Sequence, residues 1–136
     1  MSDRKPRLDP ALVEEFVGRA HGDLPRVGEL LTAHPSLVNA AWDWGAGDWE
    51  TGLGAAAHMG RRDIATLLLA HGARMDIFAA AMLGHLAIVR AIIDAHPEAV
   101  TWPGPHGIPL LAHAEKGGPD AAETLAYLRH FMGDTP

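Results

Sequence analysis

Residues 51–76 read TGLGAAAHMGRRDIATLLLAHGARMD, and this stretch is the most informative part of the sequence for predicting the fold. Residues 55–57 are alanines, which are strong helix formers and are small enough to let neighbouring helices approach closely. Ile64 and Leu68 recur at helical spacing on one face of a second helix. Gly60, between the two helices, permits a left-handed turn that a side chain would penalise. The stretch predicts a helix–turn–helix unit whose apolar face is buried only by stacked neighbours.

Two markers of this unit recur along the chain. Glycines in the position between the helices are spaced by 38, 24 and 33 residues, at Gly22, Gly60, Gly84 and Gly117. An apolar pair of the second helix moves with them, at residues 30–31, 68–69 and 92–93. The markers predict helix pairs near residues 11–32, 53–71, 77–95 and 109–131. An oversized loop separates the first two pairs, and the short second step leaves almost no room for a hairpin, so little or no strand is expected.

Residues 107–114 read GIPLLAHA, where the ankyrin-repeat family usually has Thr-Pro-Leu-His-x-Ala-Ala. With the alanine-rich first helices and the interhelical glycines, the chain resembles this family over roughly residues 10–131, in the form of short, free-standing bacterial ankyrin proteins. The resemblance implies an all-α, ankyrin-type α-solenoid of about four helix–turn–helix repeats with irregular hairpin fingers. The domain would span residues 10–132, between tails at 1–9 and 133–136. The resemblance also implies a cytoplasmic protein–protein interaction module with an unidentified protein partner, and not an enzyme.

Composition excludes several classes of function. The chain has no cysteine among its 136 residues, which excludes disulfides, thiol catalysis and cysteine zinc sites. Its formal net charge of −6 and the lack of a clustered basic face argue against a nucleic-acid partner. No apolar run approaches the about 20 residues of a membrane span, and residues 1–7 lack the apolar core of a secretory signal. We expect a monomer or a weak homo-oligomer, the latter through apolar residues of the weakly matched first unit, Val13, Phe16 and Val17.

The oversized loop contains three of the four tryptophans, within residues 42–50, which read WDWGAGDWE. Tryptophan offers a large, rigid contact area and is enriched in binding hot spots, so this segment predicts a partner-binding finger. The alternative is a structural lid whose rings pack over the first two units. Residues that precede the interhelical glycines and the turn around Trp102 extend the expected concave binding face. The predicted partner-binding residues are Trp42, Trp44, Asp48, Trp49, Glu50, His58, Met59, Met82, Leu83, Trp102, His106, Glu115 and Lys116.

Histidine is the reactive residue that the chain over-uses, with nine copies. Those near the ends of second helices, such as His71 and His96, are expected to donate to carbonyl groups left free there. Others support an alternative function, a small metal-dependent or acid–base enzyme. Because no motif spaces metal ligands along the chain, we expect no bound metal and no cofactor. The residues of the alternative site are His58, His106 and His113, with Asp48 or Glu115.

Overall fold

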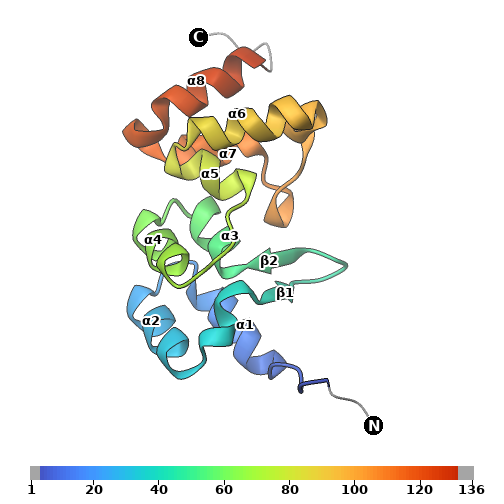
Figure 1. Ribbon diagram of the computed structural model, residues 1–136, viewed down its shortest axis with the longest axis vertical. Coiled ribbons are helices and arrows are strands. Elements are labelled where there is room, and N and C mark those ends of the chain that lie inside the picture. The colour runs from blue at the N-terminus through green and yellow to red at the C-terminus, as the bar shows by residue number, and fades with distance from the viewer. Residues whose placement is uncertain (1–3, 132–136) are drawn as a thin grey trace.

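The computed structural model describes residues 4–131 (Figure 1). This part of the chain is predominantly helical, as predicted, with one small antiparallel hairpin in the oversized loop. The first three residues of the predicted tail at 1–9, and the whole of the predicted tail at 133–136, lie outside the described range. No helix within residues 4–131 combines the length and the apolar character needed to cross a membrane.

The described residues form eight α-helices, four short 3-10 helices and two strands. The α-helices are α1 (Pro10–Arg19), α2 (Leu24–Ala33), α3 (Gly52–His58), α4 (Arg62–Ala70), α5 (Ile77–Leu83), α6 (Leu86–Ala95), α7 (Leu110–Lys116) and α8 (Ala122–Phe131). The 3-10 helices are η1 (Pro35–Asn39), η2 (Pro97–Thr101), η3 (Pro105–Gly107) and η4 (Gly118–Ala121). The strands are β1 (Ala41–Asp43) and β2 (Trp49–Thr51), with Trp42 opposite Glu50.

Helix pairs follow one another along the long axis of the molecule, from α1 and α2 at one end to α7 and α8 at the other (Figure 1). The short helix α3 packs on α5, and α5 packs on α7. Every alanine in residues 55–57 and 79–81 is fully buried, because these small side chains face neighbouring helices at close range. Helix α5 supplies Ala79 to one apolar cluster and Ala80 to the other, so the core continues across it.

Met82 and Leu83 are buried at the end of α5, so the expectation that they offer apolar surface to a partner is wrong. The backbone after α7 approaches this end closely: a Cβ atom at Gly117 would overlap the carbonyl oxygen of Met82. Helical periodicity places these residues on a face of α5 but does not say that another helix covers it.

The apolar residues of the first unit are also covered. Val13, Phe16 and Val17 are buried. The Phe16 ring lies directly against the start of α3, 2.9 Å from the position that a Cβ at Gly52 would take. The surface expected to support self-association is therefore part of the core.

Two interhelical glycines adopt the predicted left-handed turn. Gly60 has φ of 69° and Gly84 has φ of 78°. At Gly84 the turn also passes close to another segment, because a Cβ there would overlap the carbonyl oxygen of Asp120. Glycine is thus required at this position for its backbone conformation and for its lack of a side chain.

We predict that Gly84→Ala lowers the free energy of unfolding by about 3 kcal/mol or more, since backbone strain and overpacking add. Gly72→Ala is the matched control: its φ is 96°, but no atom lies within 4 Å of the added Cβ. The control should lose only about 1–2 kcal/mol, the cost of the left-handed backbone. Urea denaturation followed by circular dichroism measures both. Equal losses would show that the contact with Asp120 is not important.

Candidate metal centre

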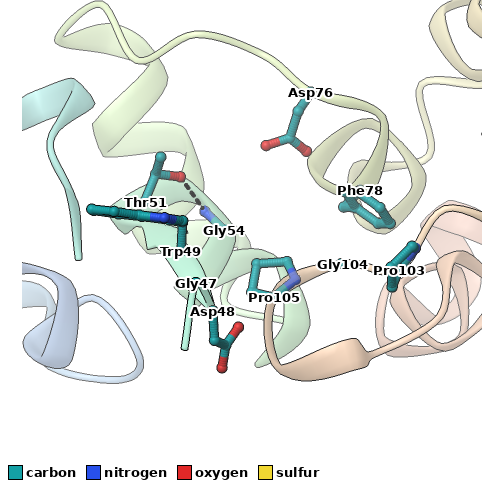
Figure 2. Close-up of a pocket in the computed structure, with 10 residues that line it drawn as sticks. All are labelled: Gly47, Asp48, Trp49, Thr51, Gly54, Asp76, Phe78, Pro103, Gly104 and Pro105. Atoms are coloured by element: carbon teal, nitrogen blue, oxygen red, sulfur yellow. Dashed lines mark hydrogen bonds between the residues drawn. The ribbon is translucent and has the colours of Figure 1, made fainter. Parts of the chain in front are cut away.

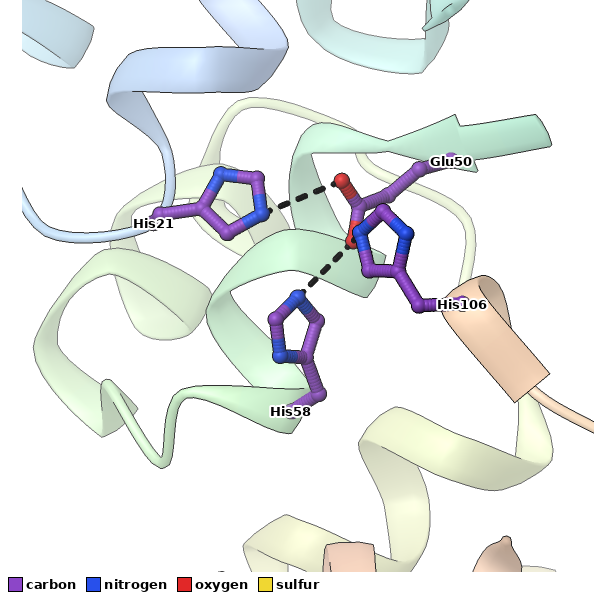
Figure 3. Close-up of side chains that lie close together, drawn as sticks. All are labelled: His21, Glu50, His58 and His106. Atoms are coloured by element: carbon purple, nitrogen blue, oxygen red, sulfur yellow. Dashed lines mark ion pairs between the residues drawn. The ribbon is translucent and has the colours of Figure 1, made fainter. Parts of the chain in front are cut away.

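Four side chains that are distant in sequence point toward one another on one side of the helical stack (Figure 3). They are His21, in the turn after α1; Glu50, in β2; His58, the last residue of α3; and His106, in η3. One potential ligand atom from each lies within 4.8 Å of those of the others. Three imidazoles and a carboxylate form a typical ligand set for a transition-metal ion.

The hairpin directs Glu50 toward the histidines. Successive residues of a strand face opposite sides, and in β2 the Trp49 side chain is exposed while Glu50 is buried. The loop that joins the strands is held by the Asp43 carboxylate, which accepts backbone N–H bonds from Gly45 and Gly47 at 2.8 and 3.0 Å. This local turn sets the hairpin register and hence the position of Glu50.

The Glu50 carboxylate is the centre of the cluster. Its Oε1 atom lies 3.2 Å from His21 Nε2 and accepts a hydrogen bond of 2.8 Å from Trp44 Nε1. Its Oε2 atom lies 2.9 Å from His58 Nε2 and 3.2 Å from His106 Nε2. All three imidazoles therefore present the same ring nitrogen to one carboxylate.

The opposite ring nitrogens of two histidines are bound to acceptors. His21 Nδ1 lies 3.0 Å from the carbonyl oxygens of both Val17 and Gly18, and His106 Nδ1 lies 2.7 Å from Asp48 Oδ2. Carbonyl and carboxylate oxygens only accept hydrogen bonds, so Nδ1 carries the proton in each neutral ring. The Nε2 atoms then direct lone pairs at Glu50, which is also an acceptor. Metal-binding histidines are typically oriented in this way.

The charges of the cluster are strongly coupled. Burial by itself raises the pKa of Glu50, but the neighbouring His21, His58 and Trp44 side chains outweigh it and lower that pKa to about 2. The Glu50 carboxylate in turn raises the pKa of His21, against the effect of burial. The His106 backbone N–H lowers the pKa of Asp48. Both carboxylates are thus ionised at neutral pH.

Two buried atoms in the cluster have no hydrogen-bond partner in the protein: Glu50 Oε2 and His58 Nε2. They face each other at 2.9 Å, but the geometry is not that of a hydrogen bond. Buried polar atoms are nearly always satisfied, so such a pair requires a physical reason. A cation between the two atoms would satisfy both.

The contacts between Glu50 and the three imidazoles have a spacing that suits a metal ion. Zinc binds imidazole nitrogen and carboxylate oxygen at about 2.0–2.2 Å, so tetrahedral ligand atoms lie about 3.3 Å apart. The Glu50 contacts of 2.9–3.2 Å are close to this spacing. The imidazole and carboxylate donors also suit Mn²⁺, Fe²⁺ and Ni²⁺, whereas Mg²⁺ and Ca²⁺ prefer an all-oxygen shell.

The structure brings together part of the site predicted from sequence. His58 and His106 meet, with ring centroids 5.3 Å apart, and Asp48 binds His106. His113 does not join them: it is buried against Phe78, and its Nδ1 donates to the carbonyl oxygen of Pro109. Burial lowers the pKa of His113. Glu115, the other carboxylate considered, is exposed and is not part of the cluster.

Sequence reasoning missed His21 and misjudged Glu50. His21 lies one residue before the interhelical Gly22 and His58 lies two residues before Gly60, so the repeat register was a signal that both rings lie near the ends of first helices. Glu50 was predicted to bind a partner as part of the finger, but its side chain is buried. The expectation of no metal rested on the lack of ligand spacing in the sequence, but the fold brings together four potential ligand side chains that have no such spacing.

The tryptophans of the hairpin are in three different environments. Trp42 packs partly buried against the apolar core, and Trp44 donates to Glu50. Trp49 is 61% exposed, as predicted for at least one ring of the finger. Met59 and Trp102, two other predicted binding residues, are also exposed. Trp42 and Trp44 fit the structural alternative, and Trp49 remains accessible to a partner.

A pocket of about 400 Å³ lies between the hairpin, the start of α5 and the loop that leads into η3 (Figure 2). Asp48 connects this pocket to the cluster, because it lines the pocket and also binds His106. Asp76 caps α5 by accepting from the Ala79 N–H, and burial raises its pKa. The lining residues are Gly47, Asp48, Trp49, Thr51, Gly54, Asp76, Phe78, Pro103, Gly104 and Pro105.

The histidines outside the cluster have ordinary surroundings. His71 Nδ1 lies 2.9 Å from the Leu67 carbonyl oxygen near the end of α4, which confirms its predicted role at the helix end. His96 follows α6 and lies 3.5 Å from Glu98. His96 is therefore a suitable control for substitutions in the cluster.

We predict that Trp44→Phe lowers the free energy of unfolding of the metal-free protein by about 1.5–3 kcal/mol. This is the scale of a hydrogen bond to a charged group, and the substitution removes the indole donor of the buried Glu50. Trp49→Phe replaces the exposed ring of the same hairpin and should change the free energy of unfolding by no more than about 0.5 kcal/mol. Guanidinium denaturation in the presence of a chelator compares the two. A similar small effect for both variants would show that Glu50 does not depend on Trp44.

Comparisons with known proteins do not assign the chain to a family. No protein-family model, curated protein or solved structure matches it. The geometry of the cluster and its surroundings is therefore the basis for a proposed function.

Proposed function

We propose that the protein binds one divalent transition-metal ion, of the zinc class, through His21, Glu50, His58 and His106. The observation that carries this proposal is the convergence of three Nε2 atoms on one buried carboxylate. Without a cation, the Nε2 lone pairs of neutral His21 and His106 would face the lone pairs of the carboxylate. The proposal replaces the interaction module as the leading function.

Protons alone are a poor alternative to the metal ion. His21 and His106 already carry a proton on Nδ1, so each would have to become an imidazolium before its Nε2 could donate to Glu50. Holding two imidazoliums side by side at a partly buried position would be costly. A single divalent cation provides the required charge and leaves every imidazole neutral.

The surrounding contacts support binding through Nε2. Backbone carbonyls orient His21 and the Asp48 carboxylate orients His106. Asp48 also accepts the backbone N–H of His106 at 2.8 Å. This double contact matters because His106 has a positive φ of 59°, an uncommon conformation for a residue with a side chain. Outer partners of this kind fix the tautomer and orientation of metal-binding histidines.

We also propose that the scaffold is an ankyrin-type solenoid. The recurring helix pairs, the left-handed turns at Gly60 and Gly84, and the row of α3, α5 and α7 support this assignment. In such a scaffold the hairpin between α2 and α3 is one finger, and the segment that contains η3 is another. Two fingers and two first helices would then supply the ligands.

Partner binding is a second candidate function, supported by the exposure of Trp49 beside the pocket of Figure 2. An exposed tryptophan is typical of binding hot spots. Met59 and Trp102 would add apolar surface, and the exposed Glu115 and Lys116 would form a polar rim. Capture of a protein partner that is lost on replacing Trp49 but not on removing metal would support this function.

We predict that metal-free protein without a polyhistidine tag binds about one Zn²⁺ per chain in isothermal titration calorimetry. His58→Ala should weaken binding by more than the about 10–100-fold that loss of an outer partner costs, because it removes a ligand. His96→Ala removes an exposed histidine outside the cluster and should leave affinity unchanged. No binding by the wild type, or an equal loss in both variants, would contradict the proposed site.

We predict that Asp48→Asn weakens zinc binding by about 10–100-fold without unfolding the protein. An amide nitrogen at the Oδ2 position would donate to His106 Nδ1, and this favours the tautomer whose Nε2 is protonated and cannot bind metal. Asp94→Asn is the control, since Asp94 is exposed on α6 and lies outside the cluster. Equal affinity of the two variants would show that Asp48 does not orient His106.

A further inference from the structure

The cluster is covered on one side and accessible on the other. The side chains of Glu50 and His58 are 0% and 10% exposed, whereas those of His21 and His106 are 26% and 32% exposed. An ion held by these groups would therefore be sealed on the Glu50 and His58 side and reachable by solvent between His21 and His106. Structural zinc sites are closed, and catalytic ones keep a position for water, which beside four protein ligands would be a fifth position on this solvent-facing side.

We propose that this metal centre is catalytic and hydrolyses uncharged carboxylic esters at its solvent-facing side. This inference rests on the proposed metal function, because water activation requires the ion. A bound divalent ion lowers the pKa of its water ligand and polarises a substrate carbonyl group.

Charge favours an uncharged carbonyl compound over a phosphate ester. A divalent ion and the carboxylates of Glu50 and Asp48 sum to no net charge. Among the described residues, the hydrogen bonds and ion pairs of the four ligand side chains involve no arginine or lysine. Phosphoryl transfer depends on cationic groups that stabilise the charged transition state, and the site lacks them.

Two arginines on neighbouring elements are paired with carboxylates. Arg19, on α1, lies 3.5 Å from Asp23, and Arg61, at the start of α4, lies 2.8 Å from Asp63. Their charges are thus largely neutralised where they lie. Within the described residues, neither arginine forms an ion pair with a ligand side chain of the cluster.

Trp44 provides an apolar wall at the accessible side. Its ring centroid lies 6.2 Å from that of His21 and 6.3 Å from that of His106, and the side chain is partly exposed. The Nε1 donor is used by Glu50, which leaves the ring face and edge for apolar contact. The alcohol or acyl part of an ester suits such a surface.

The reaction balances without an oxidant or reductant. Water at the ion loses a proton to solvent, and its oxygen forms a bond to the carbonyl carbon of the ester. The bond between that carbon and the alcohol oxygen then breaks, and the alkoxide takes a proton from solvent. The products are an alcohol and a carboxylic acid, which loses its proton at neutral pH to become a carboxylate.

The test compares hydrolysis of 4-nitrophenyl acetate and 4-nitrophenyl phosphate by the full chain, metal-free and loaded with one equivalent of Zn²⁺. Calorimetry on the same samples reports zinc binding separately. His58→Ala and His96→Ala are compared under the same conditions. Exposed imidazoles can react with the acetate ester without metal, but the metal-free protein shows that background as well, so only a zinc-dependent increase reports the proposed site.

The expected result is saturable ester hydrolysis with multiple turnovers, at a rate about 100-fold or more above that of the metal-free protein. This is the lower end of the rate enhancement that a single catalytic effect typically provides. The increase should be lost in His58→Ala, retained in His96→Ala and absent for the phosphate. Stoichiometric zinc binding without ester hydrolysis would overturn the catalytic inference and leave the metal site standing. Faster turnover of the phosphate would overturn the substrate class, and absence of zinc binding would overturn both proposals.

Discussion

The buried carboxylate of Glu50 is the group on which the arrangement around the site depends. An unpartnered carboxylate is costly to remove from water, so the fold must supply donors or a cation around it. Trp44, His21, His58 and His106 surround it, and each comes from a different segment. Satisfying one buried charge therefore holds the α1–α2 turn, the hairpin, the end of α3 and η3 in fixed relation to one another.

The hairpin has two connected roles at this site. It directs Glu50 inward, and it also supplies Asp48, two residues earlier in the chain. Asp48 binds both the ring and the backbone N–H of His106, which is 58 residues away in the sequence. The left-handed backbone at His106 is held by these contacts, so the position of this imidazole depends on a finger that belongs to a different part of the chain. The extra length of the loop between α2 and α3 thus has a structural explanation that also bears on function.

Local chemistry explains which parts of the fold were predictable. The alanines at 55–57 and 79–81 favour helix and tolerate close packing, and both segments are helical and buried. Gly60 and Gly84 were predicted to take left-handed turns, and both do. The same reasoning failed at Met82, because periodicity identifies the face of a helix on which a residue lies, whereas burial depends on whether another helix packs there.

From the sequence alone, the helical character, the positions of the turns and the candidacy of His58, His106 and Asp48 could be inferred, since residue type and short-range spacing govern them. Only the tertiary structure shows that His21 belongs to the site, that Glu50 is buried in it and that His113 lies outside it. The physical reason is that a metal centre is defined by distances of a few ångströms between atoms on separate elements. Those distances are set by how the helices stack and how the hairpin folds back on them, and side-chain propensities acting over a few residues do not determine either.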